Sequence, residues 1–285
     1  MPDKCKTKYP IMLIHGIGYN DADHPEYWGR IPEILRENGA EIYFGGQDGF
    51  GNVTHNAEQL KTAMQKTLAA AGAEKLNLIA HSKGGVEARY ALTKLGMGSK
   101  AASLTTMATP HRGIMTIDKM KIKPGKGPLK FLYRIFGMML RIDGGELPET
   151  DDVYDQLTAD YMKVFNDMVR DVPGVYYQSY AFDMKNSYSD PAMGLFYSIV
   201  EKNEGSNDGL VSVESAKWGD FRGIVGGIGA QGISHPKAVD GNKKPVDGPV
   251  HLHYSRRENG TMRYSYSDIT DFYIDMVSRL ADMGL

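Results

Sequence analysis

Apolar residues gather in short, nearly continuous runs, separated by stretches in which they recur every three or four positions. Such runs are typical of strands buried on both faces of a sheet, and a spacing of three or four is typical of amphipathic helices. Because the two patterns alternate with short connections, we expect an α/β fold with a mostly parallel central sheet flanked by helices. The expected strands are residues 9–14, 41–44, 76–80 and 102–108, and the expected helices are residues 28–38, 56–71 and 83–95.

The alternation stops after residue 113 and resumes near residue 158. Residues 114–150 hold a basic stretch rich in proline and glycine, then an apolar segment and an acidic stretch, and we expect an insertion there. Beyond it, the patterns predict a helix at 158–169, a strand at 175–182, a hairpin at 249–265 that turns at an Asn-Gly pair, and a C-terminal helix at 268–280.

Composition narrows the class of protein. The 285 residues carry a formal net charge of −2, which gives no sign of nucleic acid as a partner. This length suits a single domain over residues 1–285, and the lone Cys5 excludes an intrachain disulfide.

The N-terminus lacks the apolar stretch of a signal peptide, so the chain as written is expected to be cytoplasmic, with secretion after removal of a leader as the alternative. We expect no membrane-spanning helix, because no apolar run reaches about 18 residues.

The segment with the clearest chemistry is the expected strand 76–80, followed by His81-Ser82-Lys83-Gly84-Gly85 and a helix. A serine at a tight turn between a strand and a helix is held in a strained conformation above the sheet edge, where its hydroxyl can act as a nucleophile. Ala80 stands at the first small position of the G-x-S-x-G pattern and Gly84 at the second. A serine there could instead simply cap the helix, but the strand–turn–helix context favours a nucleophilic Ser82.

Acyl transfer to serine also needs two hydrogen-bond donors for the developing oxyanion. One is expected to be the backbone N–H of Lys83, directly after the serine, because it lies at the start of a helix. The other is expected in the loop after the first strand, at the backbone N–H of Ile17 in His15-Gly16-Ile17. The imidazole of His15 is read as a buried structural group.

A nucleophilic serine needs a histidine base and a carboxylate that orients the base, in the chain order serine, acid, histidine. His235 is the preferred base because it lies in a glycine-rich loop, and His251 is the second choice. Asp208, on an Asn-Asp-Gly turn, is the preferred acid, with Asp183 and Asp190 as alternatives. The histidines that follow Ser82 are His111, His235, His251 and His253.

With these residues in view, the chain resembles the bacterial triacylglycerol lipases of the α/β-hydrolase fold, over most of residues 9–113 and again over about 150–240. The matching motifs are YPIMLIHG at 9–16, AHSKGG at 80–85, ATPHRG at 108–113, NDGLV at 207–211 and SH at 234–235. The resemblance independently favours Asp208 and His235. It implies hydrolysis of carboxylic esters through an acyl-enzyme, with no cofactor and with a lipid or other ester as substrate.

The insertion lies where these lipases carry a lid, so we expect a lid-like insertion at about 114–150. Its apolar segment has two interpretations that the sequence does not separate. It is either an ordinary core-packing helix or a mobile cover over an apolar acyl site that touches lipid transiently when open.

Two features depart from the lipase pattern or imitate another class. Many of these lipases bind Ca²⁺ through an aspartate two residues after the histidine, where this chain has Lys237, so we expect no metal and read Asp240 as a solvated carboxylate. Residues 227–232 fit the dinucleotide pattern G-x-G-x-x-G, but the sequence predicts neither a preceding strand nor a following helix, so no dinucleotide site is expected.

The sequence therefore predicts a serine carboxylic-ester hydrolase, a lipase, that uses Ser82, Asp208 and His235. A thioesterase, an acyltransferase or a polyester depolymerase would use the same fold and triad, because these fix the mechanism rather than the substrate. A non-catalytic binding protein on this scaffold would be expected to lack a member of the triad, and all three candidates are present.

Overall fold

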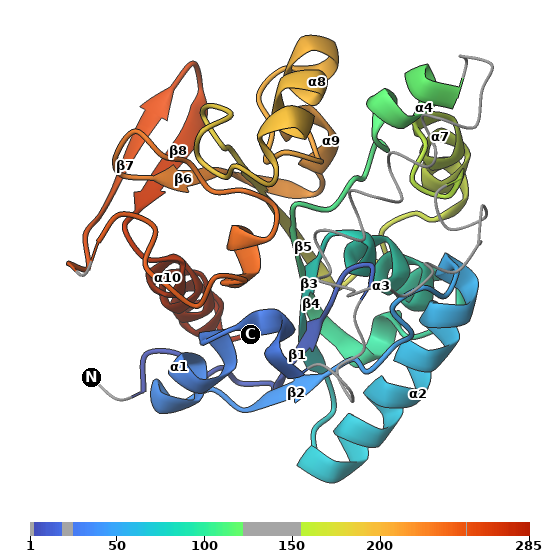
Figure 1. The fold of residues 1–285 in the computed structure, drawn as a ribbon. Helices are drawn as coiled ribbons and strands as arrows, with labels where there is room; N and C mark the ends of the chain where they lie inside the picture. The colour runs from blue at the N-terminus through green and yellow to red at the C-terminus, as the bar shows by residue number, and fades with distance from the viewer. Residues whose placement is uncertain (1–2, 19–24, 122–154, 249) are drawn as a thin grey trace.

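The computed structural model describes residues 3–18, 25–121, 155–248 and 250–285, and they build an eight-stranded sheet between two layers of helices (Figure 1). The strand order is β2-β1-β3-β4-β5-β6-β8-β7, and every neighbouring pair is parallel except β8 and β7. The strands are β1 (Ile11–Ile14), β2 (Ile42–Phe44), β3 (Leu76–His81), β4 (Ala101–Met107), β5 (Tyr176–Phe182), β6 (Asp220–Gly227), β7 (His253–Glu258) and β8 (Thr261–Tyr266).

The helices divide between the two faces of the sheet. Figure 1 shows α2 and α3 together on one face and α1 and α10 on the other. The α-helices are α1 (Ile31–Glu37), α2 (Val53–Ala71), α3 (Lys83–Lys94), α4 (Met115–Lys121), α7 (Ala159–Met168), α8 (Gly194–Glu204), α9 (Val213–Ala216) and α10 (Ile269–Asp282). The described residues also form the 3₁₀ helices η1 (Pro25–Trp28), η2 (Gly98–Lys100) and η3 (Lys237–Val239).

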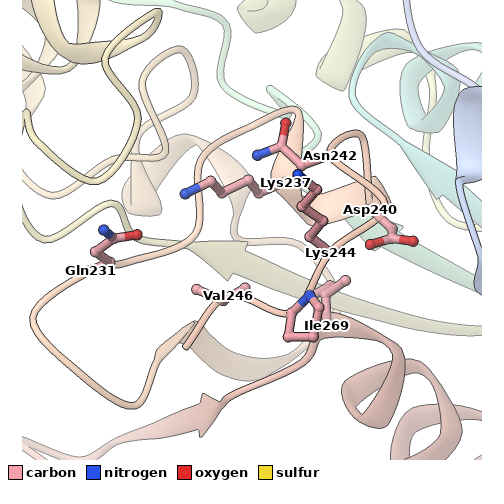
Figure 2. A pocket seen from close by; sticks show the side chains of 8 residues that line it. Gln231, Lys237, Asp240, Asn242, Lys244, Val246 and Ile269 are labelled. Atoms are coloured by element: carbon pink, nitrogen blue, oxygen red, sulfur yellow. The ribbon is translucent and has the colours of Figure 1, made fainter. Parts of the chain in front are cut away.

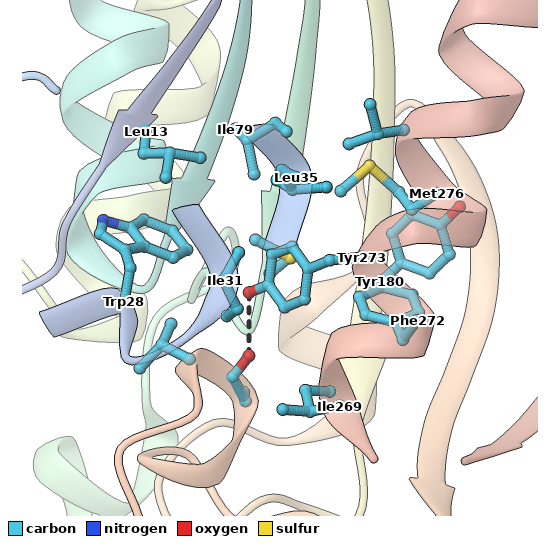
Figure 3. Close-up of a cluster of buried hydrophobic side chains, with 14 of the residues drawn as sticks. Leu13, Trp28, Ile31, Leu35, Ile79, Tyr180, Ile269, Phe272, Tyr273 and Met276 are labelled. Carbon is cyan, nitrogen blue, oxygen red and sulfur yellow. Dashed lines mark hydrogen bonds between the residues drawn. The ribbon is translucent and has the colours of Figure 1, made fainter. Parts of the chain in front are cut away.

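The core explains why the strands are apolar without alternation. In β1, Leu13 packs with α1 and α10 while Ile14 packs with α2 and α3, so both faces of the strand are buried. Trp28, Tyr180 and Phe272 join the first of these clusters (Figure 3). A parallel sheet covered on both faces requires this pattern, since side chains on either side of each strand leave water.

Capping and turn residues explain several of the observed boundaries. The helix expected at 56–71 begins earlier, at Val53, because the Asn52 side chain accepts a hydrogen bond from the His55 N–H. It ends at Gly72, whose φ of 62° is left-handed. The expected hairpin is confirmed: β7 and β8 are joined by Asn259 and Gly260, both with positive φ, as the favoured two-residue turn requires.

The expectation that no strand precedes the glycines at 227–232 is wrong, because β6 ends at Gly227. The strand was missed because its start is exposed and charged and because three of its residues are glycine. The dinucleotide pattern still lacks its second half. The segment that follows leads to the 3₁₀ helix η3 rather than to an α-helix, so no helix N-terminus meets the glycines.

The lid-like insertion predicted at about 114–150 falls mostly outside the described residues, which contain only its first part, including α4. The choice between a core helix and a mobile cover therefore stays open. Across the described ranges, no helix is long and apolar enough to span a membrane.

Candidate active site

Ser82 lies between the end of β3 and the start of α3, in a conformation that serine rarely adopts. Its φ of 54° and ψ of −133° lie outside the regions favoured for residues with a Cβ atom. Its backbone N–H donates to the Met107 carbonyl of the neighbouring strand at 2.9 Å, which helps to hold the turn. The strained strand-to-helix turn predicted from the sequence is therefore present, with the serine at its apex.

Glycines let the loop after β1 pack closely against the serine turn and the start of α3. A Cβ atom on Gly16 would lie 2.8 Å from the Ser82 Cβ, which places the loop after β1 directly beside the serine. A Cβ atom on Gly84 would lie 2.2 Å from the His15 carbonyl oxygen. The small residue at 84 is thus needed for the approach of the His15 loop to α3, a contact that the sequence pattern alone does not reveal.

The structure brings His235 and Asp208 together in a buried pair. Nδ1 of His235 lies 2.7 Å from Oδ2 of Asp208, and the His235 N–H donates to the Asp208 carbonyl at 2.8 Å. The other carboxylate oxygen of Asp208 accepts the N–H groups of Leu210 at 3.0 Å and Val211 at 2.8 Å. A carboxylate fixed in this way holds the imidazole in one orientation and one tautomer, as an acid–base histidine requires.

The alternative acids and base lie elsewhere. Asp183 pairs with Arg263 at 3.1 Å, and Asp190 accepts the Ser234 hydroxyl at 2.6 Å. His251 is exposed and pairs with Asp271 on α10 at 2.9 Å. Among the described residues, Asp208 is the carboxylate that is hydrogen-bonded to the His235 ring, so the geometry favours Asp208 and His235.

The loop that carries His235 is fastened to the rest of the molecule on several sides. Arg30 donates to both carboxylate oxygens of Asp240, at 2.7 and 2.8 Å, and also pairs with Asp268 at 2.9 Å. Tyr273 of α10 donates to the Ala238 carbonyl at 2.8 Å (Figure 3). The Lys237 ammonium donates to the Ser189 carbonyl at 2.6 Å.

This arrangement changes the interpretation of Asp240, which was expected to be a solvated loop carboxylate and is instead buried against Arg30. Its oxygens are engaged by a guanidinium rather than facing solvent. In the part of the chain that the structure describes, no cluster of three or more His, Cys, Asp or Glu residues is suited to hold a metal ion.

Two aromatic residues that sequence reasoning missed surround the site. The rings of His81 and His235 lie 4.5 Å apart between centroids. The Tyr27 hydroxyl oxygen lies 2.5 Å from Nδ1 of His81 and accepts the Gly16 N–H at 2.9 Å. Burial first, and then the neighbouring His235, hold the pKa of His81 well below its ordinary value of 6.5. The signal for His81 was its place inside the AHSKGG motif, whereas nothing local marks Tyr27.

The two backbone groups expected to bind an oxyanion, the N–H groups of Ile17 and Lys83, lie on the two segments that meet at Ser82. Within the described residues, neither N–H donates to an acceptor in the protein, whereas the Gly16 N–H donates to the Tyr27 hydroxyl and the Gly18 N–H to the Gly49 carbonyl. Two N–H groups on adjacent segments beside the serine are the kind of arrangement that can receive an oxyanion.

A pocket of about 330 Å³ is lined largely by the segment that follows His235 (Figure 2). It contains neither Ser82 nor Ile17, so it is separate from the expected acyl site. Its lining residues are Gln231, Lys237, Asp240, Asn242, Lys244, Pro245, Val246 and Ile269.

Comparison with known proteins relates this geometry to a family. Residues 10–167 match the family model described as "Putative serine esterase (DUF676)". Triacylglycerol lipase 2 of Saccharomyces cerevisiae is 28% identical over 290 residues, which cover 99% of this chain and 78% of that protein. A triacylglycerol lipase of Pseudarthrobacter phenanthrenivorans is 39% identical over 112 residues, which cover 38% of this chain and 34% of that protein.

Solved structures share the architecture. The mature lipase BlEst2 of Bacillus licheniformis has a TM-score of 0.65 at 21% identity, covering 85% of this chain and 90% of that chain. EstA from Clostridium botulinum has a TM-score of 0.62 at 17% identity, covering 97% of this chain and 88% of that chain. At these identities the likeness establishes the fold, and it confirms the α/β-hydrolase fold expected from the sequence.

Proposed function

This chain belongs to the DUF676 serine esterase family and is therefore a carboxylic ester hydrolase; we propose that it is a lipase whose nucleophile is Ser82. The proposal assigns the base to His235, the orienting carboxylate to Asp208, and the oxyanion donors to the backbone N–H groups of Ile17 and Lys83.

In this mechanism His235 takes the Ser82 hydroxyl proton as the serine oxygen attacks the ester carbonyl. Asp208 stabilises the imidazolium that forms, since its Oδ2 faces the protonated Nδ1 at 2.7 Å. The N–H groups of Ile17 and Lys83 hold the tetrahedral oxyanion, and each contributes about 3 kcal/mol to lowering the barrier. His235 then protonates the leaving alcohol. Water next gives a proton to His235 as it attacks the carbonyl of the acyl-enzyme, and His235 returns that proton to the Ser82 oxygen as the carboxylic acid leaves.

The single observation that carries the proposal is the buried His235–Asp208 pair, whose imidazole packs against the ring of His81, the residue directly before Ser82. A histidine paired to a carboxylate at the surface is common, as His251 and Asp271 illustrate. A buried pair whose imidazole packs against the residue directly before a strained serine is suited to the role of the base that activates that serine.

A lipid ester as substrate is supported by the names of the relatives, which include triacylglycerol lipases of a yeast and a bacterium. The proposed substrates are therefore triacylglycerols and related lipid esters. The lid-like insertion is proposed to touch the lipid interface transiently.

The test compares the protein with Ser82→Ala on p-nitrophenyl butyrate, p-nitrophenyl palmitate and a triolein emulsion. The proposal predicts that Ser82→Ala loses turnover of all three by about 10⁵-fold or more, because the remaining groups cannot form an acyl-enzyme. Ser103→Ala is the matched control, since Ser103 is a buried serine on β4 whose hydroxyl donates to the Asn77 side chain at 2.6 Å. Full turnover by Ser82→Ala would overturn the assignment of the nucleophile. If the unchanged protein hydrolysed the p-nitrophenyl esters but not triolein, the proposal that it is a lipase would be overturned.

A further inference from the structure

Lys83, whose backbone N–H is one of the two proposed oxyanion donors, forms a buried ion pair through its side chain. The Lys83 ammonium contacts the Glu87 carboxylate one helical turn along α3, and the two side chains are only 1% and 2% exposed. The Lys83 ammonium also donates to the Gly51 carbonyl at 2.7 Å. Residues four apart on a helix pair commonly at the surface, where such a pair contributes little. A fully buried pair is costly to desolvate and is retained only where its remaining groups are satisfied.

Glu87 is satisfied by two neutral amides in addition to the lysine. Asn56 of α2 donates to Oε1 at 2.7 Å, and Gln47 donates to Oε2 at 3.2 Å. The carboxylate therefore joins α3 to α2 and to the loop after β2. Since a carboxylate only accepts hydrogen bonds, it fixes the orientation of both amides.

Gln47 extends this network to the loop that carries Ile17. Its side-chain Nε2 donates to the His15 main-chain carbonyl at 2.9 Å as well as to Glu87, and its main-chain carbonyl oxygen lies 2.9 Å from Nε2 of the His15 ring. Gln47 is fully buried. Of the two hydrogen bonds between Gln47 and His15, which directly precedes Gly16 and Ile17, only the one from Nε2 belongs to the Gln47 side chain, and the same Nε2 also donates to Glu87.

The contacts form a continuous path from one proposed donor to the other. It runs from the His15–Ile17 loop through Gln47 and Glu87 to the side chain of Lys83, whose own backbone N–H is the second donor. We propose that Gln47 is a positioning residue that sets the separation of the two oxyanion donors, and that the buried Lys83–Glu87 ion pair holds Gln47 in place. This inference rests on the proposed function and adds to it a side chain that touches neither the substrate nor Ser82.

The physical reason is the narrow geometry of oxyanion binding. Donors act when they lie about 2.7–3.1 Å from the developing oxyanion, and a displacement of about 1 Å can cost about 10²-fold in rate. Both donors here are backbone groups on separate segments, so their separation depends on what joins the segments. Loss of the hydrogen bonds that join the two segments weakens binding of the transition state and leaves binding of the substrate largely unchanged.

The first variant is Gln47→Met, which keeps the length and volume of the side chain and removes its amide. We expect kcat for p-nitrophenyl butyrate to fall about tenfold or more while KM changes less than about twofold. The second-order rate of Ser82 labelling by a fluorophosphonate, and the affinity for phenylboronic acid, which forms a tetrahedral adduct with serine, should fall by similar factors.

Gln178→Met is the matched control. Gln178 is also buried and donates to Thr105 at 2.8 Å, but it lies near the start of β5, away from the ends of the strands where Ser82 is found. Thermal unfolding of both variants measures the structural cost of losing a buried amide. The control should lose stability to a similar extent and keep the kcat, labelling rate and boronic acid affinity of the unchanged protein.

A second variant, Lys83→Met combined with Glu87→Met, guards against a Gln47→Met protein that fails to fold. Removing both partners of a buried ion pair in favour of apolar groups of similar volume is often neutral for stability. It leaves Gln47 without its anchor, so kcat should again fall with little change in KM.

The outcomes separate this inference from the proposed function. If the unchanged protein is labelled at Ser82 while folded Gln47→Met, or the folded double variant, keeps kcat and labelling within about twofold, the positioning role is overturned and the proposed function stands. A loss of kcat that Gln178→Met shares equally would also overturn the positioning role, because it would follow stability alone. If the unchanged protein is not labelled at Ser82, the proposed function fails and this inference fails with it.

Discussion

The imidazole rings of His81 and His235 lie with their centroids 4.5 Å apart and their planes inclined at 45°. Burial is the main reason that the pKa of His81 lies well below its ordinary value of 6.5, so this ring is neutral beside the proposed base. A neutral neighbour leaves the imidazolium that His235 is proposed to form without a like charge in contact. His81 thus packs against the proposed base as a neutral ring.

The buried histidines predict how stability depends on pH. Burial also lowers the pKa of His111, helped by Arg89 and Arg112, so the unfolded chain binds protons where the folded protein does not. The stability that depends on these two neutral rings is fully present above about pH 6.5, the ordinary pKa of histidine. It is lost as the pH falls below that value toward the lower pKa of the folded state. Urea unfolding between about pH 7.5 and about pH 5 should show this loss, and His111→Gln should reduce its slope. An unchanged slope would contradict the account.

Asp208→Asn should reduce kcat by up to about 10⁴-fold while the protein stays folded. The amide keeps an oxygen for the N–H groups of Leu210 and Val211 but presents an N–H to Nδ1 of His235, which favours the wrong tautomer. The measurement is steady-state hydrolysis of p-nitrophenyl butyrate. Asp190→Asn is the control and should keep most of the activity, because Asp190 is bonded to Ser234. Equal losses in the two variants would argue against a special role for Asp208.

Gly84→Ala should impair both stability and activity although alanine is the better helix former. The added Cβ would lie 2.2 Å from the His15 carbonyl oxygen, so either α3 or the loop with Ile17 must move. Overpacking of this kind costs about 1–3 kcal/mol of unfolding free energy. Gly226→Ala is the control, since its Cβ would meet nothing closer than Lys185 at 3.5 Å. Thermal unfolding and kcat measure the two effects, and a fully active, fully stable Gly84→Ala would refute the packing argument.

Arg30→Leu should destabilise the base loop by removing the guanidinium between two buried carboxylates. Asp240 and Asp268 are 1% and 2% exposed, and breaking a buried pair by removing one partner costs about 3–5 kcal/mol. Urea unfolding measures this change. Arg170→Leu breaks a pair whose two side chains are each 72% exposed and should cost less than about 1 kcal/mol. Equal costs for the two variants would show that the Arg30 contacts are dispensable.

The sheet and the serine turn were predictable because both leave local signals. Strands such as Leu76–His81 are buried on both faces, so they are apolar without interruption, and the motif around Ser82 combines a strand, small residues and a helix. Strand β6 left no such signal, since glycines and an exposed, charged start hide its buried half.

The contacts around the site could not be predicted, because they join segments far apart in the chain. Lys83 and Glu87 look like a surface pair from their spacing, and only the packing of the Gln47 and Asn56 segments over α3 buries them. The same holds for Asp240, which looks like a loop carboxylate until Arg30, 210 residues away, is brought against it. Sequence patterns report the period of burial along one element but not which elements meet.

The most direct test of the central claim is labelling of the intact protein with a fluorophosphonate, followed by peptide mapping of the modified residue. The account predicts a single label on Ser82, lost in Ser82→Ala and kept in Ser103→Ala. A label on another serine, or ester hydrolysis by a protein that takes no label with or without detergent, would contradict it.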